Sequence, residues 1–102
     1  MSGRAPFDAA MGTLGWDGCR LRVAATFEAR ARGMIGCART SRIAMAFPRC
    51  RSVHTCFMTV PLDIAFIDRE GSVLAVYKDV GPWRVLAVPG AWGVLERVSR
   101  AG

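Results

Sequence analysis

The sequence predicts an α+β fold, in which a small, mainly antiparallel β-sheet or a partly closed barrel is accompanied by one short helix. Most of the chain divides into apolar or alternating segments of about four to eight residues, which is the length and pattern of strands. Turn-forming pairs such as Gly81-Pro82 and Pro89-Gly90 separate these segments. Only one stretch repeats its apolar residues with a helical period instead.

The N-terminal part of the chain lacks such a pattern. Residues 1–18 are mostly small and carry several glycines, so a loose tail is expected there. The 102-residue length suits one hydrophobic core, and residues 19–102 are expected to form a single β-rich domain. In residues 19–26, arginines alternate with apolar side chains, which predicts a first strand with one face in water.

The predicted helix follows this strand. Thr26 is a suitable N-cap, and Gly36 is a suitable end. The apolar residues between them recur at i, i+4, i+7 and i+8: Phe27, Ala31, Met34 and Ile35. This spacing places them on one side of a short helix.

The remaining segments are predicted to be strands, at residues 43–47, 52–58, 62–67, 72–78, 83–88 and 93–98. Asp68 to Gly71 predicts a tight hairpin turn, because Gly71 can adopt a positive φ without steric cost. The strand after this turn is almost entirely apolar, which predicts that both of its faces are buried.

The positive charge of the chain is concentrated in its first half. The formal net charge is +6, and residues 1–52 supply all of the excess. A basic surface suits nucleic acid, but Lys78 is the only lysine, and the absence of Asn and Gln indicates a biased codon pool. Nucleic-acid binding is therefore the third-ranked function, through Arg20, Arg22, Arg30, Arg32 and Arg39.

No segment predicts export or membrane insertion. The apolar runs are too short to cross a bilayer, and Met1 to Gly18 has no apolar core of the signal-peptide kind. A cytoplasmic location is expected. The cysteines form no C-x-x-C pair, so they are most simply buried thiols in a reducing compartment. No cofactor is expected.

The only histidine, His54, lies between Cys50 and Cys56. On one continuous strand these three side chains would share a face, since side chains alternate with a period of two. Neighbours on a strand converge poorly on a metal ion, so no metal site is predicted. A thiol-dependent hydrolase using Cys56 and His54, helped by Asp63, is the alternative enzymatic function.

Asp63 interrupts an apolar strand, where a carboxylate is costly unless a partner is fixed beside it. The favoured expectation is a structural role, in which Asp63 either caps a turn after Pro61 or forms an ion pair with a buried arginine such as Arg84. The other possibility is that Asp63 belongs to a ligand-binding face.

The chain resembles the bacterial and archaeal family called domain of unknown function 192. The segments that carry the resemblance are Arg30–Gly36, Val53–Met58, Pro61–Asp68 with Gly71 and Val73, Pro82–Arg84, and Val94–Glu96. The resemblance implies a compact, mostly β domain with one short helix, and it implies no reaction. Cys37 replaces an arginine that is usual in the family. The chain ends at Gly102, before a further strand that other members have, so an open sheet edge that pairs with another chain is expected.

The function expected first is therefore a non-catalytic binding module. A concave sheet face would hold a small ligand or an extended peptide. Its expected lining is His54, Asp63, Trp83 and Arg84, because these are polar or aromatic residues within or beside apolar strands.

Overall fold

The computed structural model describes residues 4–24, 34 and 40–99. Its elements are α1 (Ala5–Leu14), β1 (Arg20–Val23), β2 (Ile43–Pro48), β3 (Ser52–His54), β4 (Leu62–Ile67), β5 (Val73–Val80), β6 (Val85–Ala87) and β7 (Gly93–Val98). Five strands form the main sheet in the order β1-β2-β7-β4-β5, and β3 pairs with β6 in a second, two-stranded sheet. Only the β1–β2 pairing is parallel among the described strands. The predicted α+β class with a small, mainly antiparallel sheet is confirmed.

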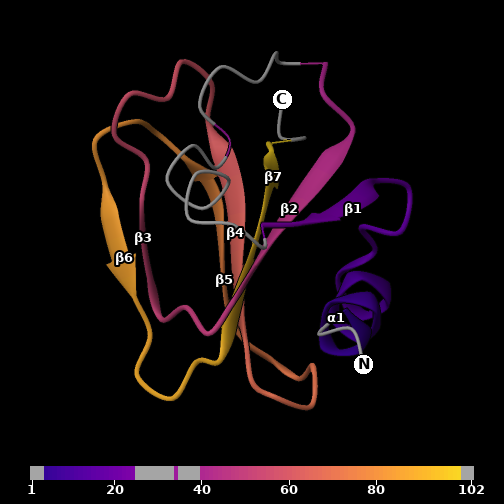
Figure 1. The fold of residues 1–102 in the computed structure, drawn as a ribbon. Coiled ribbons are helices and arrows are strands. Elements are labelled where there is room, and N and C mark those ends of the chain that lie inside the picture. The colour runs from indigo at the N-terminus through magenta and orange to yellow at the C-terminus, as the bar shows by residue number, and fades with distance from the viewer. Residues whose placement is uncertain (1–3, 25–33, 35–39, 100–102) are drawn as a thin grey trace.

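The described elements form three layers (Figure 1). The main sheet lies in the middle, with α1 beside one face and the β3–β6 sheet beside the other. All six residues of β4 are buried, because both faces of this central strand are covered. Ile64 and Phe66 pack into the core under β3 and β6, whereas Ala65 and Ile67 pack into the core under α1.

The prediction of a loose N-terminal tail is wrong for residues 5–14, because these residues form α1. Phe7 and Ala10 are fully buried, and the Phe7 ring lies 5.3 Å from the ring of Trp92. Pro6 occupies the first turn, where its missing N–H costs nothing. Gly15 ends the helix with a left-handed φ of 73°. The buried face of this helix consists of only Phe7, Ala10 and Met11, and the alanines and glycine around them give no clear helical pattern in the sequence.

Two strands differ from their predicted extent or burial. β3 ends at His54 instead of continuing to Met58, because the chain turns over residues 55–58: the Thr55 carbonyl accepts a hydrogen bond from the Met58 N–H, and Phe57 adopts a φ of 68°. β5 is mostly exposed instead of buried on both faces, since it lies at the edge of the main sheet and pairs only with β4. The helix predicted at residues 27–35 falls outside the described residues, apart from the buried Met34.

The predicted hairpin between β4 and β5 is confirmed. The side-chain Oδ1 of Asp68 accepts hydrogen bonds from the backbone N–H groups of Glu70 (3.0 Å) and Ser72 (2.9 Å). Gly71 has a φ of 92° and is buried. A Cβ atom there would lie 2.6 Å from the backbone oxygen of Pro6, so this turn packs directly against α1. No helix among the described residues has the length and apolar character needed to span a membrane.

Gly71→Ala is expected to lower the free energy of unfolding by about 2 kcal/mol or more, because it combines left-handed strain with a clash against α1. Urea denaturation measures the change. Gly12→Ala is the matched control: Gly12 lies in α1, and a Cβ atom added there would have nothing within 4 Å. The control is expected to stabilise the protein by up to about 1 kcal/mol. Equal effects of the two substitutions would contradict the docking of this turn on α1.

Candidate functional site

Asp63 is buried on the α1 side of β4 and is held by two partners. Its Oδ1 accepts a hydrogen bond from the backbone N–H of Asp79 at 2.9 Å. Its Oδ2 accepts one from the Nε of Arg97 at 3.0 Å, which is also a salt bridge. The Arg97 guanidinium in turn lies 4.5 Å from the centre of the Trp16 ring. The expectation that a partner is fixed beside this carboxylate is confirmed.

The expected identity of that partner, Arg84, is wrong. Arg97 lies directly opposite Asp63 in the β4–β7 pairing, so the two side chains share a face of the main sheet. Arg84 precedes β6 in the second sheet. Arg97 was missed, although it interrupts an apolar strand in the same way as Asp63. Aligning the two interruptions across antiparallel strands would have found the pair.

Thr55 joins the turn after β3 to the turn before β6. It is 1% exposed, and its hydroxyl donates to the Gly81 carbonyl at 2.7 Å while accepting from the Arg84 N–H at 2.9 Å. Its backbone N–H donates to the Arg84 carbonyl, and its own carbonyl accepts from the N–H groups of Met58 and Trp83. All polar groups of this one residue are therefore used to hold the two turns together.

These two turns display large apolar side chains in water. Phe57 and Trp83 are each 64% exposed, and Val85 is 74% exposed. The rings of Phe57 and Trp83 pack edge to face with centres 4.8 Å apart. Both residues have left-handed backbones, with φ values of 68° and 63°. We call Phe57, Trp83 and Val85, together with the adjacent His54 and Arg84, the aromatic tip.

The structure therefore brings together three of the four residues expected to line a binding face. His54 pairs with Val85 across the β3–β6 ladder, and Trp83 and Arg84 immediately precede that strand. Asp63 is not among them, because it faces α1 on the opposite side of the main sheet. Thr55 and Phe57 were missed, since neither a polar core residue nor a left-handed phenylalanine has a distinct local signal.

The cysteines beside His54 do not form a shared site with it. β3 ends at His54, and the imidazole Nδ1 accepts a hydrogen bond from the backbone N–H of Cys56 at 3.2 Å. The Cys50 thiol instead donates to the Ser52 carbonyl at 3.1 Å. Within residues 4–24, 34 and 40–99, no three His, Cys, Asp or Glu side chains are grouped as a metal site.

Glu96 is a buried carboxylic acid on the other face of β7. It is 4% exposed and lies between Met45 of β2 and Ile64 of β4. Burial raises the pKa of the Glu96 carboxyl from 4.5 to about 8, because removal from water disfavours the charged form. Glu96 is therefore mostly protonated at neutral pH.

Asp63→Asn is expected to lower the free energy of unfolding by about 3 kcal/mol, because it leaves the largely buried Arg97 guanidinium without its counter-charge. Chemical denaturation at neutral pH measures the loss. Asp8→Asn is the control, since Asp8 forms a 3.5 Å ion pair with Arg4 in which both side chains are about half exposed. Breaking such a pair is expected to cost less than about 1 kcal/mol. A loss for Asp63→Asn as small as that of the control would contradict a structural role.

The protonation of Glu96 predicts that stability falls as pH rises. The folded pKa lies above the unfolded value, so the contribution is complete below pH 4.5 and is lost as pH rises towards about 8. The total fall is as much as about 5 kcal/mol. Glu96→Gln is expected to remove most of this slope in urea denaturation between these pH values. Glu70→Gln, in the exposed β4–β5 turn, should retain it, and parallel profiles for wild type and Glu96→Gln would contradict the prediction.

Comparison with solved structures supports the same fold. A protein of unknown function from Novosphingobium aromaticivorans superposes with a TM-score of 0.69 and 22% identity, over 80% of this chain and 64% of that one. A protein from Sinorhizobium meliloti described as a "putative transcription regulator" gives a TM-score of 0.66 and 20% identity, over 78% of this chain and 67% of that one. This chain thus spans just under two thirds of the first protein's length.

Sequence comparison places the chain in a family. No curated protein matches it significantly. The model of the family called domain of unknown function 192, described as "Uncharacterized ACR", matches residues 12–99. That match includes every described strand and the residues of the aromatic tip. The chain therefore belongs to the domain of unknown function 192 family.

Proposed function

We propose that this protein is a non-catalytic binding module whose aromatic tip holds an extended, acidic peptide segment. The observation that carries the proposal is the pair of exposed aromatic residues with left-handed backbones. This conformation costs about 1–2 kcal/mol for each non-glycine residue. An exposed edge-to-face contact returns only about 0.5–1.5 kcal/mol. Folding alone therefore gains little from Phe57 and Trp83, whereas an aromatic surface fixed in water suits recognition.

The shape of the tip favours a peptide over a small molecule. Phe57, Trp83 and Val85 project outward with about two thirds or more of their surface in water. Small ligands are usually held in concave sites that cover most of their surface. A projecting aromatic pair instead suits a partner that lies across it and inserts its own apolar side chain beside the rings.

The charge of the tip indicates the chemistry of the partner. Arg84 is exposed next to Trp83, and His54 is exposed on the neighbouring strand. The formal net charge of the whole chain is +6. Opposite charges raise association rates and fix orientation across such surfaces. We therefore expect a peptide in which a large apolar residue is flanked by Asp or Glu.

The two alternative functions have less support. A thiol hydrolase would need the Cys56 thiol beside the imidazole, but His54 Nδ1 binds the backbone N–H of Cys56. Nucleic-acid binding would use Arg20 and Arg22, which are exposed on the edge strand β1. The other three arginines of that hypothesis lie outside the described residues, so only Arg20 and Arg22 can be placed on the structure.

The test is to select peptides from a library of random linear sequences on the immobilised full chain, and to measure the selected sequence by fluorescence anisotropy. We expect acidic peptides with one large apolar residue. Trp83→Gly should weaken their binding roughly tenfold or more, because aromatic residues dominate such interfaces. The same substitution should change the free energy of unfolding by less than about 1 kcal/mol, since relief of strain offsets the lost ring contact.

Leu74→Ala is the matched control, because Leu74 is an exposed apolar residue on β5 outside the tip. Its binding should equal that of the wild type. The proposal fails if selection enriches no sequence, or if Trp83→Gly binds the selected peptide as tightly as the wild type does.

A further inference from the structure

Two adjoining hollows lie where the loop after α1 meets the starts of β1 and β2. One has a volume of about 490 Å³ and is lined by Gly18, Cys19, Arg20, Arg42 and Ile43. The other, of about 230 Å³, is lined by Gly15, Trp16, Gly18, Cys19, Arg42 and Arg97. Because three lining residues are common to both, the hollows form one region. We call it the arginine hollow. Its size lies within the range of sites that hold small molecules.

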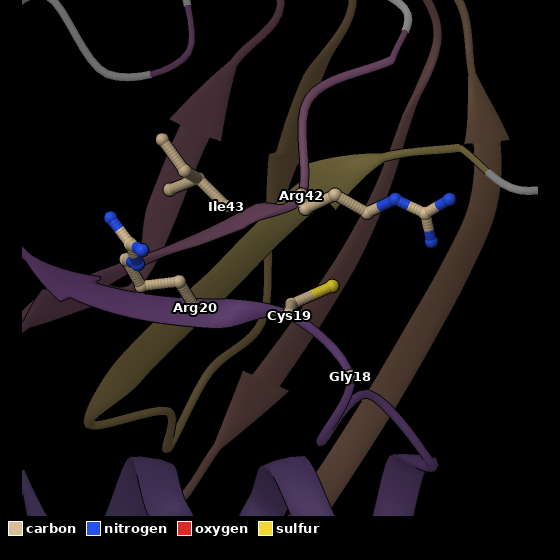
Figure 2. A pocket seen from close by; sticks show the side chains of 5 residues that line it. All are labelled: Gly18, Cys19, Arg20, Arg42 and Ile43. Atoms are coloured by element: carbon tan, nitrogen blue, oxygen red, sulfur yellow. The ribbon is translucent and has the colours of Figure 1, made fainter.

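The side chains that line the arginine hollow extend from both faces of the main sheet. Figure 2 shows Cys19 and Arg42 extending to one side, while Arg20 and Ile43 extend to the other. Arg20 and Ile43 are partners in the β1–β2 pairing, so they share a face. Arg42 therefore lies on the side that also contains Trp16 and Arg97.

Arg97 presents a guanidinium that is already fixed in place. Asp63 binds its Nε, and the Trp16 ring lies against its central carbon. No described acceptor binds its two Nη groups. The Arg97 side chain is 16% exposed and lines the smaller hollow. Its Nη groups are donors of a preorganised guanidinium at the wall of the hollow.

The hollow also carries positive charge without a matching acid. Arg42 and Arg20 form no ion pair with any described carboxylate. Asp17 is the only acidic residue of the loop at residues 15–19, and it lines neither hollow. Asp63 compensates Arg97 alone. A ligand bearing negative oxygens would therefore meet Arg42 and Arg97 with no acidic side chain among the lining residues of either hollow.

We propose that the arginine hollow binds a small oxyanion, with Arg42 and the Nη groups of Arg97 as its principal donors. The shared chemistry is that of a phosphate group or a carboxylate, since both accept paired hydrogen bonds from guanidinium. Gly15 and Gly18 line the hollow without contributing side chains to it. The two proposed donors, Arg42 and Arg97, lie on the α1 side of the main sheet, whereas the aromatic tip lies on the β3–β6 side. The two proposals are therefore independent of each other.

The test is an NMR titration of the full-length, ¹⁵N-labelled protein with pyrophosphate, inorganic phosphate and succinate in separate arms. We expect the signals of the Trp16 indole, the Cys19 amide and the Arg97 Nε–H to shift together at millimolar or lower concentrations. Tighter binding of pyrophosphate or phosphate would identify a phosphate ligand, and tighter binding of succinate a carboxylate ligand.

Arg42→Ala should weaken binding roughly tenfold, as expected for loss of one charge-assisted donor. Arg42 is exposed, so this variant retains the fold even if substitutions of Arg97 do not. Arg69→Ala removes the same charge from the β4–β5 turn, which lines neither hollow, and should bind like the wild type. The proposal is overturned if no probe shifts the three signals, or if Arg42→Ala and Arg69→Ala weaken binding equally, which would indicate only a diffuse charge effect.

Discussion

The pairing of Asp63 with Arg97 is the interaction on which the arrangement of the main sheet depends. A carboxylate in a strand with both faces buried is tolerated only with fixed partners. Here its two oxygens join three strands, because one binds Arg97 of β7 and the other binds the Asp79 N–H of β5. The same guanidinium lies against Trp16, so the loop after α1 is fixed to the sheet as well. One buried charge pair thus positions the wall of the arginine hollow.

Thr55 has the corresponding role in the second layer. Its hydroxyl and backbone connect two turns that otherwise contain bulky residues in an unfavourable conformation. Asp63 and Thr55 are each buried with all of their side-chain hydrogen-bonding groups paired. The side chains that each of them positions lie nearer the surface. Polar networks of this kind specify one geometry more sharply than apolar packing does, because an unsatisfied member would be costly. This explains how a small domain can keep exposed aromatic and cationic groups in fixed positions.

The central strands could be predicted from sequence because burial on both faces leaves a continuous apolar run, and the limits of β4 and β7 match the predicted segments 62–67 and 93–98. The partner of Asp63 could not be predicted from sequence, because the choice between Arg84 and Arg97 requires knowledge of the strand register. α1 was missed because alanine and glycine suit both a loop and a helix packed closely on a sheet. The left-handed conformations of Phe57 and Trp83 are set by the contacts of Thr55, which lie beyond the range of any local pattern.

The burial of Glu96 makes the molecule more basic than its sequence suggests. The buried Asp63–Arg97 pair carries no net charge, whereas Glu96 is mostly protonated because burial raises its pKa to about 8. The formal net charge of +6 counts Glu96 as ionised, so the net charge near neutral pH is closer to +7. Arg20, Arg42 and Arg84 remain exposed. A fold that keeps one acidic side chain protonated while leaving these guanidinium groups in water favours negatively charged partners on both of its outer layers.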